Sequence, residues 1–183
     1  MSRIAIFFAT GLEEIEGLTV VDILRRAGVD VTIVSVCDTP EVTGSHDIRI
    51  TADKCIGDIN FDDYDMLILP GGMPGTTNLE LCKPLTDALI SFDKAGKRIA
   101  AICAAPGILG RLGILKGRKA CCYPGVEEEL KGAKALTVET VTDGHITTGR
   151  SMGCAIPFAL EILRVLSGEE KAQALREQIV YGH

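Results

Sequence analysis

Short aliphatic segments that alternate with amphipathic ones are the feature that most constrains the fold of this 183-residue chain. The apolar segments resemble strands that are buried on both faces of a parallel sheet. Two amphipathic segments between them have helical periodicity, and each is followed by glycine, a common helix stop. The strand candidates are residues 4–9, 29–36, 66–69 and 98–102, and the helix candidates are residues 13–27 and 79–95. This β-α-β order predicts an α/β fold in which helices cover both faces of a mostly parallel sheet.

The remaining segments extend the same pattern. Asp143-Gly144 separates two strand-like segments, 137–141 and 145–148, and this dipeptide is a strong hairpin signal. Segment 43–52 alternates apolar and polar residues, which indicates an exposed strand or a hairpin arm. Two helices are predicted at 156–166 and 169–180. Since no linker, repeat or change of composition interrupts the chain, we expect one domain over residues 1–183.

Charge and cysteine usage exclude several classes of function. The net charge is −6 and no Lys/Arg cluster is present, so we expect no binding to nucleic acid or to anionic membranes. No apolar run approaches the roughly 20 residues of a membrane span, and the N-terminus lacks the features of a signal peptide. The seven cysteines contain no C-x-x-C pair. We therefore expect reduced thiols, a cytoplasmic location, and neither a metal nor a cofactor.

Cys103 is the first candidate for chemistry. Parallel sheets bind ligands at the carboxyl ends of their strands, which here lead into loops 10–13, 70–75 and 103–107. Cys103 follows strand 98–102 and precedes Ala104-Ala105-Pro106-Gly107, and the order strand, sharp turn, helix is the arrangement of a nucleophile elbow. The amino end of that helix would stabilise a thiolate. The alternative is an inert cysteine buried for packing.

Glu16 is the second candidate, because it falls within the apolar face of helix 13–27. A carboxylate there is costly unless it is paired or protonated, so Glu16 could share a proton with Cys103 and act as a general acid/base. The alternative is a favourable interaction with the helix dipole, which explains Glu13 and Glu14 better than Glu16. The apolar face contains Leu12, Val20, Ile23, Leu24 and Ala27.

Adjacent glycines follow strand 66–69. The backbone N–H of Gly72, together with that of Ala104, could stabilise an oxyanion, whereas the alternative is an ordinary turn. A phosphate-binding P-loop is excluded because no Gly-Lys-Ser/Thr ending follows, and a dinucleotide fingerprint is absent. Tyr123 and His46 are candidates for the edge of a pocket. Otherwise Tyr123 is a surface residue, and His46 and His145 are solvated.

Four regions of the chain, in order, resemble the signatures of the DJ-1/PfpI superfamily. The resemblance covers nearly the whole sequence and is closest to the DJ-1 branch, which includes bacterial YajL-type and ThiJ-labelled proteins. The matching segments are Gly11-Leu12-Glu13-Glu14-Ile15-Glu16 with residues 21–28, Leu67-Ile68-Leu69-Pro70-Gly71-Gly72, Ala100-Ala101-Ile102-Cys103-Ala104-Ala105-Pro106, and Thr147-Thr148-Gly149-Arg150.

The resemblance implies a flavodoxin-like three-layer sandwich and a homodimer. It implies that Cys103 is the reactive cysteine, that Glu16 is its carboxyl partner, and that Gly72 and Ala104 supply backbone donors. Activities associated with the branch are glutathione-independent glyoxalase, deglycation, and redox sensing through cysteine sulfinate.

Two departures from related families narrow the chemistry. Peptidase-like members carry histidine directly after the cysteine, but this chain has Ala104, so proteolysis is not expected. Some members have histidine where this chain has Tyr123, which is a weak base at neutral pH. We therefore expect a cofactor-free, thiol-dependent enzyme that converts glyoxal and methylglyoxal into glycolate and lactate, with deglycase activity as an extension. The alternative is a redox-sensing, stress-protective protein that uses a Cys103 sulfinate without turnover.

Overall fold

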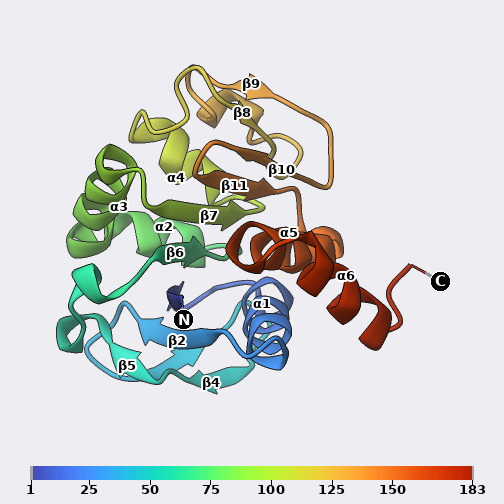
Figure 1. Cartoon of the computed structure of the whole chain (residues 1–183). Coiled ribbons are helices and arrows are strands. Elements are labelled where there is room, and N and C mark those ends of the chain that lie inside the picture. The colour runs from blue at the N-terminus through green and yellow to red at the C-terminus, as the bar shows by residue number, and fades with distance from the viewer. Residues whose placement is uncertain (1, 183) are drawn as a thin grey trace.

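A seven-stranded sheet forms the centre of the computed structural model, which describes residues 2–182. Its strand order is β10-β11-β7-β6-β1-β2-β5, and every neighbouring pair is parallel except β10 and β11 (Figure 1). The mostly parallel sheet expected from the sequence is therefore confirmed. Its strands are β1 (Arg3–Phe8), β2 (Asp30–Ser35), β5 (Lys54–Cys55), β6 (Met66–Leu69), β7 (Arg98–Ile102), β10 (Thr140–Asp143) and β11 (Ile146–Gly149).

Helices cover both faces of this sheet, as expected for a three-layer α/β sandwich. One layer contains α1 (Glu14–Arg26), α5 (Ala155–Ser167) and α6 (Glu169–Gln178), and the other contains α2 (Gly75–Leu81), α3 (Lys83–Ala95) and α4 (Pro106–Arg111). Alternate residues of β1 supply the two cores: Ile4 and Ile6 face the first layer, whereas Ala5 and Phe7 face the second. Among residues 2–182, no helix is both long enough and apolar enough to span a bilayer.

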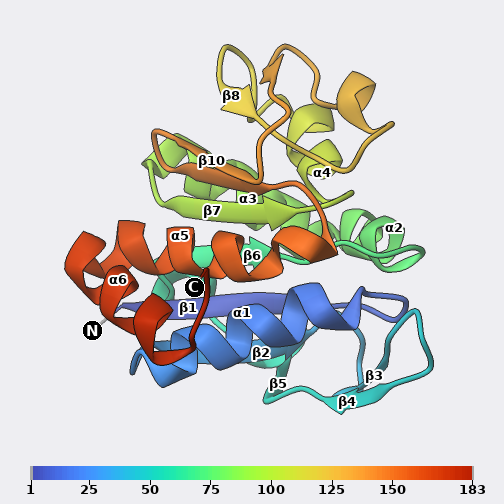
Figure 2. The same ribbon diagram turned by 90° about the vertical axis from the view of Figure 1, so that its right-hand side faces the viewer.

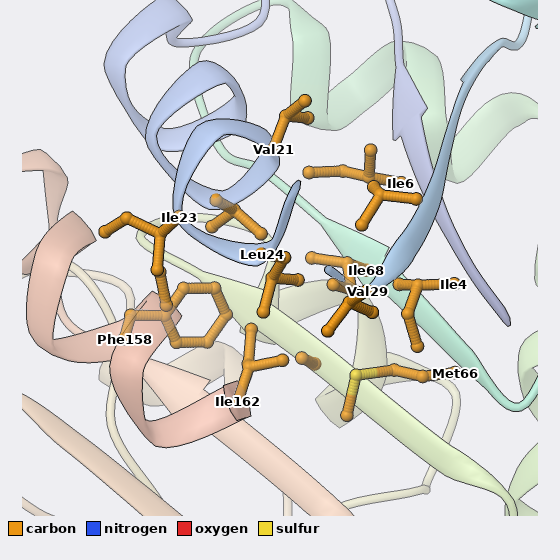
Figure 3. Packing of buried hydrophobic residues seen from close by; sticks show 14 of the residues in the cluster. Ile4, Ile6, Val21, Ile23, Leu24, Val29, Met66, Ile68, Phe158 and Ile162 are labelled. Atoms are coloured by element: carbon orange, nitrogen blue, oxygen red, sulfur yellow. The ribbon is translucent and has the colours of Figure 1, made fainter. Parts of the chain in front are cut away.

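The core beneath α1 and α5 fixes the position of the first helix. The two helices lie side by side across the sheet (Figure 2). Leu24 of α1 and Phe158 and Ile162 of α5 are buried together, beside Ile68 of β6 (Figure 3). Each such side chain contributes roughly 1.5–3 kcal/mol by leaving water. This packing holds α1, and with it Glu16, rigidly against the sheet.

Smaller elements extend from the sandwich. The alternating segment 43–52 contributes to an antiparallel pair, β3 (Glu41–Thr43) with β4 (Arg49–Thr51), in agreement with a hairpin arm. The hairpin predicted at Asp143-Gly144 is confirmed as β10 and β11, although its first arm begins at Thr140 rather than at residue 137. The other elements are β8 (Lys119–Ala120), β9 (Lys134–Ala135), η1 (Ile56–Asp58), η2 (Phe61–Asp63), η3 (Glu127–Glu129) and η4 (Met152–Cys154).

The single helix predicted over residues 79–95 was wrong, because two helices occupy this region. α2 ends at Leu81, Cys82 is extended with φ −75° and ψ 92°, and α3 begins at Lys83. Pro84 explains the break. It has no N–H to donate to the carbonyl four residues earlier, and its ring would collide with that carbonyl, so it is placed in the first turn of a new helix.

Candidate functional site

The three loops that the sequence placed at the carboxyl edge of the sheet come together in the structure. The N–H of Glu13 donates to the carbonyl of Gly71 at 2.9 Å, and the N–H of Gly75 donates to the carbonyl of Gly11 at 3.0 Å. Residues from all three loops line one pocket of about 520 Å³. The lining residues are Glu13, Glu16, Gly72, Met73, Cys103, Ala104, Tyr123, Val126 and Met152.

Cys103 occupies a sharp turn between β7 and α4. Its φ is +66°, in the left-handed region that a residue with a side chain rarely adopts. The N–H of Cys103 donates to the carbonyl of Gly149 at 3.0 Å, which helps to hold the turn. Such strain is typical of functional sites and of nucleophile elbows. The side chain is partly exposed and reaches the pocket, so the geometry fits the elbow expected from the sequence.

Glu16 lies at the base of the same pocket and is fully buried. Its Oε2 accepts a hydrogen bond from the N–H of Gly71 at 2.8 Å, whereas Oε1 has no partner in the part of the chain that the structure describes. Burial raises the pKa of Glu16 to about 7, although hydrogen bonding with Cys103 and Gly71 opposes this rise. A carboxyl with this pKa can take up or release a proton near neutral pH.

Cys103 and Glu16 influence each other's protonation. Burial raises the pKa of the Cys103 thiol, and the adjacent Glu16 carboxylate raises it further, whereas the N–H groups of Ala104 and Gly72 lower it. This differs from the resting thiolate that a helix dipole was expected to stabilise. α4 begins three residues after Cys103 and is only six residues long, so burial and the nearby carboxylate dominate. At neutral pH Cys103 therefore remains a protonated thiol, whereas Glu16 is partly ionised and can serve as its base.

The two glycines after β6 permit this close arrangement. A Cβ on Gly71 would lie 2.7 Å from Cβ of Cys103 and 2.8 Å from Oε2 of Glu16. Gly72 has a φ of +92°, and a Cβ there would collide with the backbone of residues 12 and 13. The absence of side chains lets the backbone N–H of Gly72 approach the Cys103 sulfur, as the N–H of Ala104 also does. Both predicted donors thus surround the sulfur.

Tyr123 and His46 lie in different places relative to the pocket. Tyr123 is half-exposed and lines it, and the Tyr123 N–H donates to the carbonyl of Cys103 at 2.8 Å. His46 does not line it, because Nδ1 of its exposed side chain lies 2.9 Å from Oε2 of Glu14 and 3.8 Å from Oε2 of Glu13. Within residues 2–182, Glu13, Glu14 and His46 form the one group whose possible ligand atoms lie close enough together to hold a metal ion. The hydrogen bond to Glu14 raises the pKa of His46.

His145 was expected to be solvated, and this was wrong. Its Nε2 lies 2.9 Å from Oδ1 of Asp93, which also accepts from Arg118 at 3.2 Å, and the His145 side chain is 19% exposed. It precedes β11 and is therefore at the edge of the sheet opposite Cys103. His183, the remaining histidine, is outside the described residues.

The sequence reasoning missed two pocket residues, Val126 and Met152. Met152 follows the carboxyl end of β11, which pairs in parallel with β7, so it reaches the same edge of the sheet as Cys103. The rule that ligands bind at the carboxyl ends of parallel strands identified the other three loops, and it applies to the loop after β11 as well. Val126 lies in the irregular segment between β8 and η3, for which the sequence shows no periodic signal.

Known proteins resemble this chain over most of its length. The DJ-1/PfpI family model matches residues 2–165. An Arabidopsis thaliana protein named DJ-1 homolog B is 39% identical over 172 residues, which cover 93% of this chain but only 39% of that protein. A Caenorhabditis elegans protein named glutathione-independent glyoxalase is 34% identical over 164 residues, covering 89% of this chain and 87% of that protein.

The structure points to the same relationship. A solved structure of Toxoplasma gondii DJ-1, described as oxidized, matches with a TM-score of 0.96 and 34% identity, and the match covers 100% of both chains. The family model, the relatives and the solved structure therefore all agree with the α/β sandwich described above. This chain therefore belongs to the DJ-1/PfpI family.

Proposed function

We propose that this protein is a cofactor-free, thiol-dependent enzyme that converts glyoxal and methylglyoxal into glycolate and lactate without glutathione. One observation carries the proposal: the partly exposed Cys103 shares its pocket with Glu16, whose pKa of about 7 suits proton transfer at neutral pH. The name of the C. elegans relative supports the same chemistry. Deglycation of proteins would use the same attack by the Cys103 sulfur, on the adduct that a 2-oxoaldehyde forms with a protein amine.

In the first step, the Cys103 sulfur attacks the aldehyde carbon of methylglyoxal. The Glu16 carboxylate accepts the thiol proton, because burial keeps the thiol protonated until a base removes it. A carbon–sulfur bond forms, and the aldehyde oxygen becomes an oxyanion that takes the proton from Glu16. This gives a hemithioacetal and returns Glu16 to its carboxylate form. The N–H groups of Gly72 and Ala104 surround the sulfur and would stabilise the developing negative charge.

In the second step, Glu16 removes the proton from the former aldehyde carbon, and the resulting enediol is protonated on the neighbouring carbon. The first carbon is thereby oxidised to a thioester while the second is reduced to an alcohol, so no external redox partner is needed. Water then cleaves the thioester, which releases lactate and restores the Cys103 thiol. One buried carboxyl that titrates near neutrality can perform both proton transfers.

The proposal includes the setting in which the protein works. We propose a cytoplasmic homodimer of one-domain subunits that acts on small 2-oxoaldehydes and needs neither a metal nor an organic cofactor. The net charge of −6 gives the chain little attraction for nucleic acid or anionic membranes, which is compatible with a small-molecule substrate.

The experiment that tests the proposal follows lactate by NMR after methylglyoxal is added without glutathione. We expect lactate from the wild-type protein and from Cys37→Ser, which removes a partly exposed thiol outside the pocket. Cys103→Ser should form no lactate above the protein-free background. Lactate formed equally by Cys103→Ser, or no lactate from the wild type, would refute the enzyme proposal.

A redox-sensing function is the second candidate, and the unpartnered Oε1 of Glu16 favours it. A protonated Glu16 could donate a hydrogen bond to an oxygen of a Cys103 sulfinate and so hold the sulfur at that stage. If this function is correct, mild peroxide adds two oxygens to Cys103 before any other cysteine reacts, as measured by peptide mapping. Earlier oxidation of Cys55 or Cys82 would rule it out.

A further inference from the structure

The pocket around Cys103 is larger and more apolar than a three-carbon aldehyde requires. Its volume of about 520 Å³ lies within the range of pockets that bind drug-sized molecules, roughly 300–1,000 Å³. The reactive groups occupy its base, where Glu16 is fully buried. Most of the remaining space is therefore available to a part of the substrate that does not react.

Three large apolar side chains form the rim of this space. Met73, Tyr123 and Met152 are 62%, 50% and 48% exposed, although such residues are usually buried. They come from three separate segments, the β6–α2 loop, the segment after β8, and η4. Exposed apolar side chains that converge on one cavity indicate a binding surface rather than scattered surface residues. A hydrocarbon group that bound between these side chains would remove from water both its own apolar surface and theirs.

Charge restricts the substrate further. Among residues 2–182, the only ionisable carboxyl groups that line the pocket are Glu13 and Glu16, and no lysine or arginine lines it. A negatively charged substrate tail would have no cationic partner and would be repelled by Glu13. His46, whose Nδ1 lies 3.8 Å from Oε2 of Glu13, does not line the pocket and so offers a substrate tail no direct ion pair there.

We propose that the preferred substrates are uncharged 2-oxoaldehydes with an apolar chain longer than the methyl group of methylglyoxal, and that Met73, Tyr123 and Met152 determine this preference. The inference rests on the glyoxalase function proposed above and adds which group is attached to the 2-oxoaldehyde unit of the substrate. A fully buried methylene stabilises binding by about fourfold, so a methylene that is roughly half-buried at this exposed rim stabilises it by about twofold. We therefore expect kcat/KM to rise about twofold per methylene along a straight-chain series.

The test compares straight-chain 2-oxoaldehydes from methylglyoxal to 2-oxohexanal, because the reacting carbonyls are electronically alike along this series. The same series is measured with Met73→Ser, Met152→Ser and Tyr123→Ser. The matched control is Leu81→Ser, which replaces a 75% exposed apolar residue outside the pocket. A compound of equal chain length that ends in a carboxylate tests the role of charge.

The expected result is a rising series in the wild type and in Leu81→Ser, a flatter series in the rim variants, and slower turnover of the carboxylate compound. Each rim variant should still convert methylglyoxal. A flat wild-type series, or rim variants with an unchanged slope, would overturn the inference while leaving the proposed function intact. No turnover of any 2-oxoaldehyde would instead refute the proposed function.

Discussion

Replacing Glu16 by glutamine should change stability in a way that depends on pH. The buried Glu16 carboxyl has a pKa of about 7 in the folded protein, against an ordinary value of 4.5. The folded state therefore binds this proton more tightly than the unfolded state. Its contribution to stability is fully present below pH 4.5 and is lost as the pH rises through about 7.

The size of the effect follows from the difference between the two pKa values. Each unit corresponds to about 1.4 kcal/mol, so the contribution of Glu16 to the free energy of unfolding falls by about 3 kcal/mol across this range. Glutamine keeps the shape of the side chain and an oxygen that can accept from the Gly71 N–H, but it never ionises. Glu16→Gln should therefore gain about 2–3 kcal/mol relative to the wild type between about pH 5 and about pH 8.

Urea denaturation of both proteins at these two pH values measures this gain. Any cost of the amide that is independent of pH cancels, because only the change in the difference between the proteins is used. Titrating groups that are not coupled to Glu16, such as His46, are present in both proteins and cancel as well. An equal stability difference at both pH values would show that Glu16 does not have a raised pKa, and the reasoning would fail.

Three further predictions concern the site and its assembly. Glu16→Leu should fold, because leucine continues the apolar face of α1, yet lose aldehyde turnover by about a hundredfold or more; unchanged turnover in the folded variant would end its catalytic role. Gly71→Ala should lower turnover by about a hundredfold, because its Cβ would lie 2.7 Å from that of Cys103; wild-type kinetics would contradict this. Light scattering at micromolar concentration should show a homodimer; a monomeric wild type would refute the assembly.

Local sequence patterns were sufficient to predict that Cys103 and Glu16 lie in one site. The apolar strand before Cys103, together with the rule that parallel sheets bind ligands at their carboxyl edge, placed this residue at the site. Glu16 could be identified as a candidate because its carboxyl lies within the apolar face of a helix. The break at Cys82 was also accessible from the sequence, since Pro84 cannot continue a helix.

Other features depend on contacts between distant segments. The pairing of His145 with Asp93 joins residues 52 positions apart, so no local pattern indicates it. The raised pKa of Cys103 depends on how deeply the loops around Gly71 and Ala104 bury the sulfur and on its distance from Glu16. The prediction from sequence relied on the dipole of the helix after Cys103, which would lower the thiol pKa. That helix is short, and the pKa is raised instead.

The central claim is that Glu16 controls the nucleophilicity of Cys103, and alkylation tests it most directly. The rate of Cys103 modification by iodoacetamide, followed by peptide mapping, is measured against pH in the wild type and in Glu16→Gln. We expect the wild-type rate to rise through about pH 7, as Glu16 ionises and becomes able to accept the thiol proton. Glu16→Gln should lack this rise and react only at alkaline pH, because burial still raises the thiol pKa. A wild-type rate that is flat through neutrality, or the same rise in Glu16→Gln, would contradict the claim.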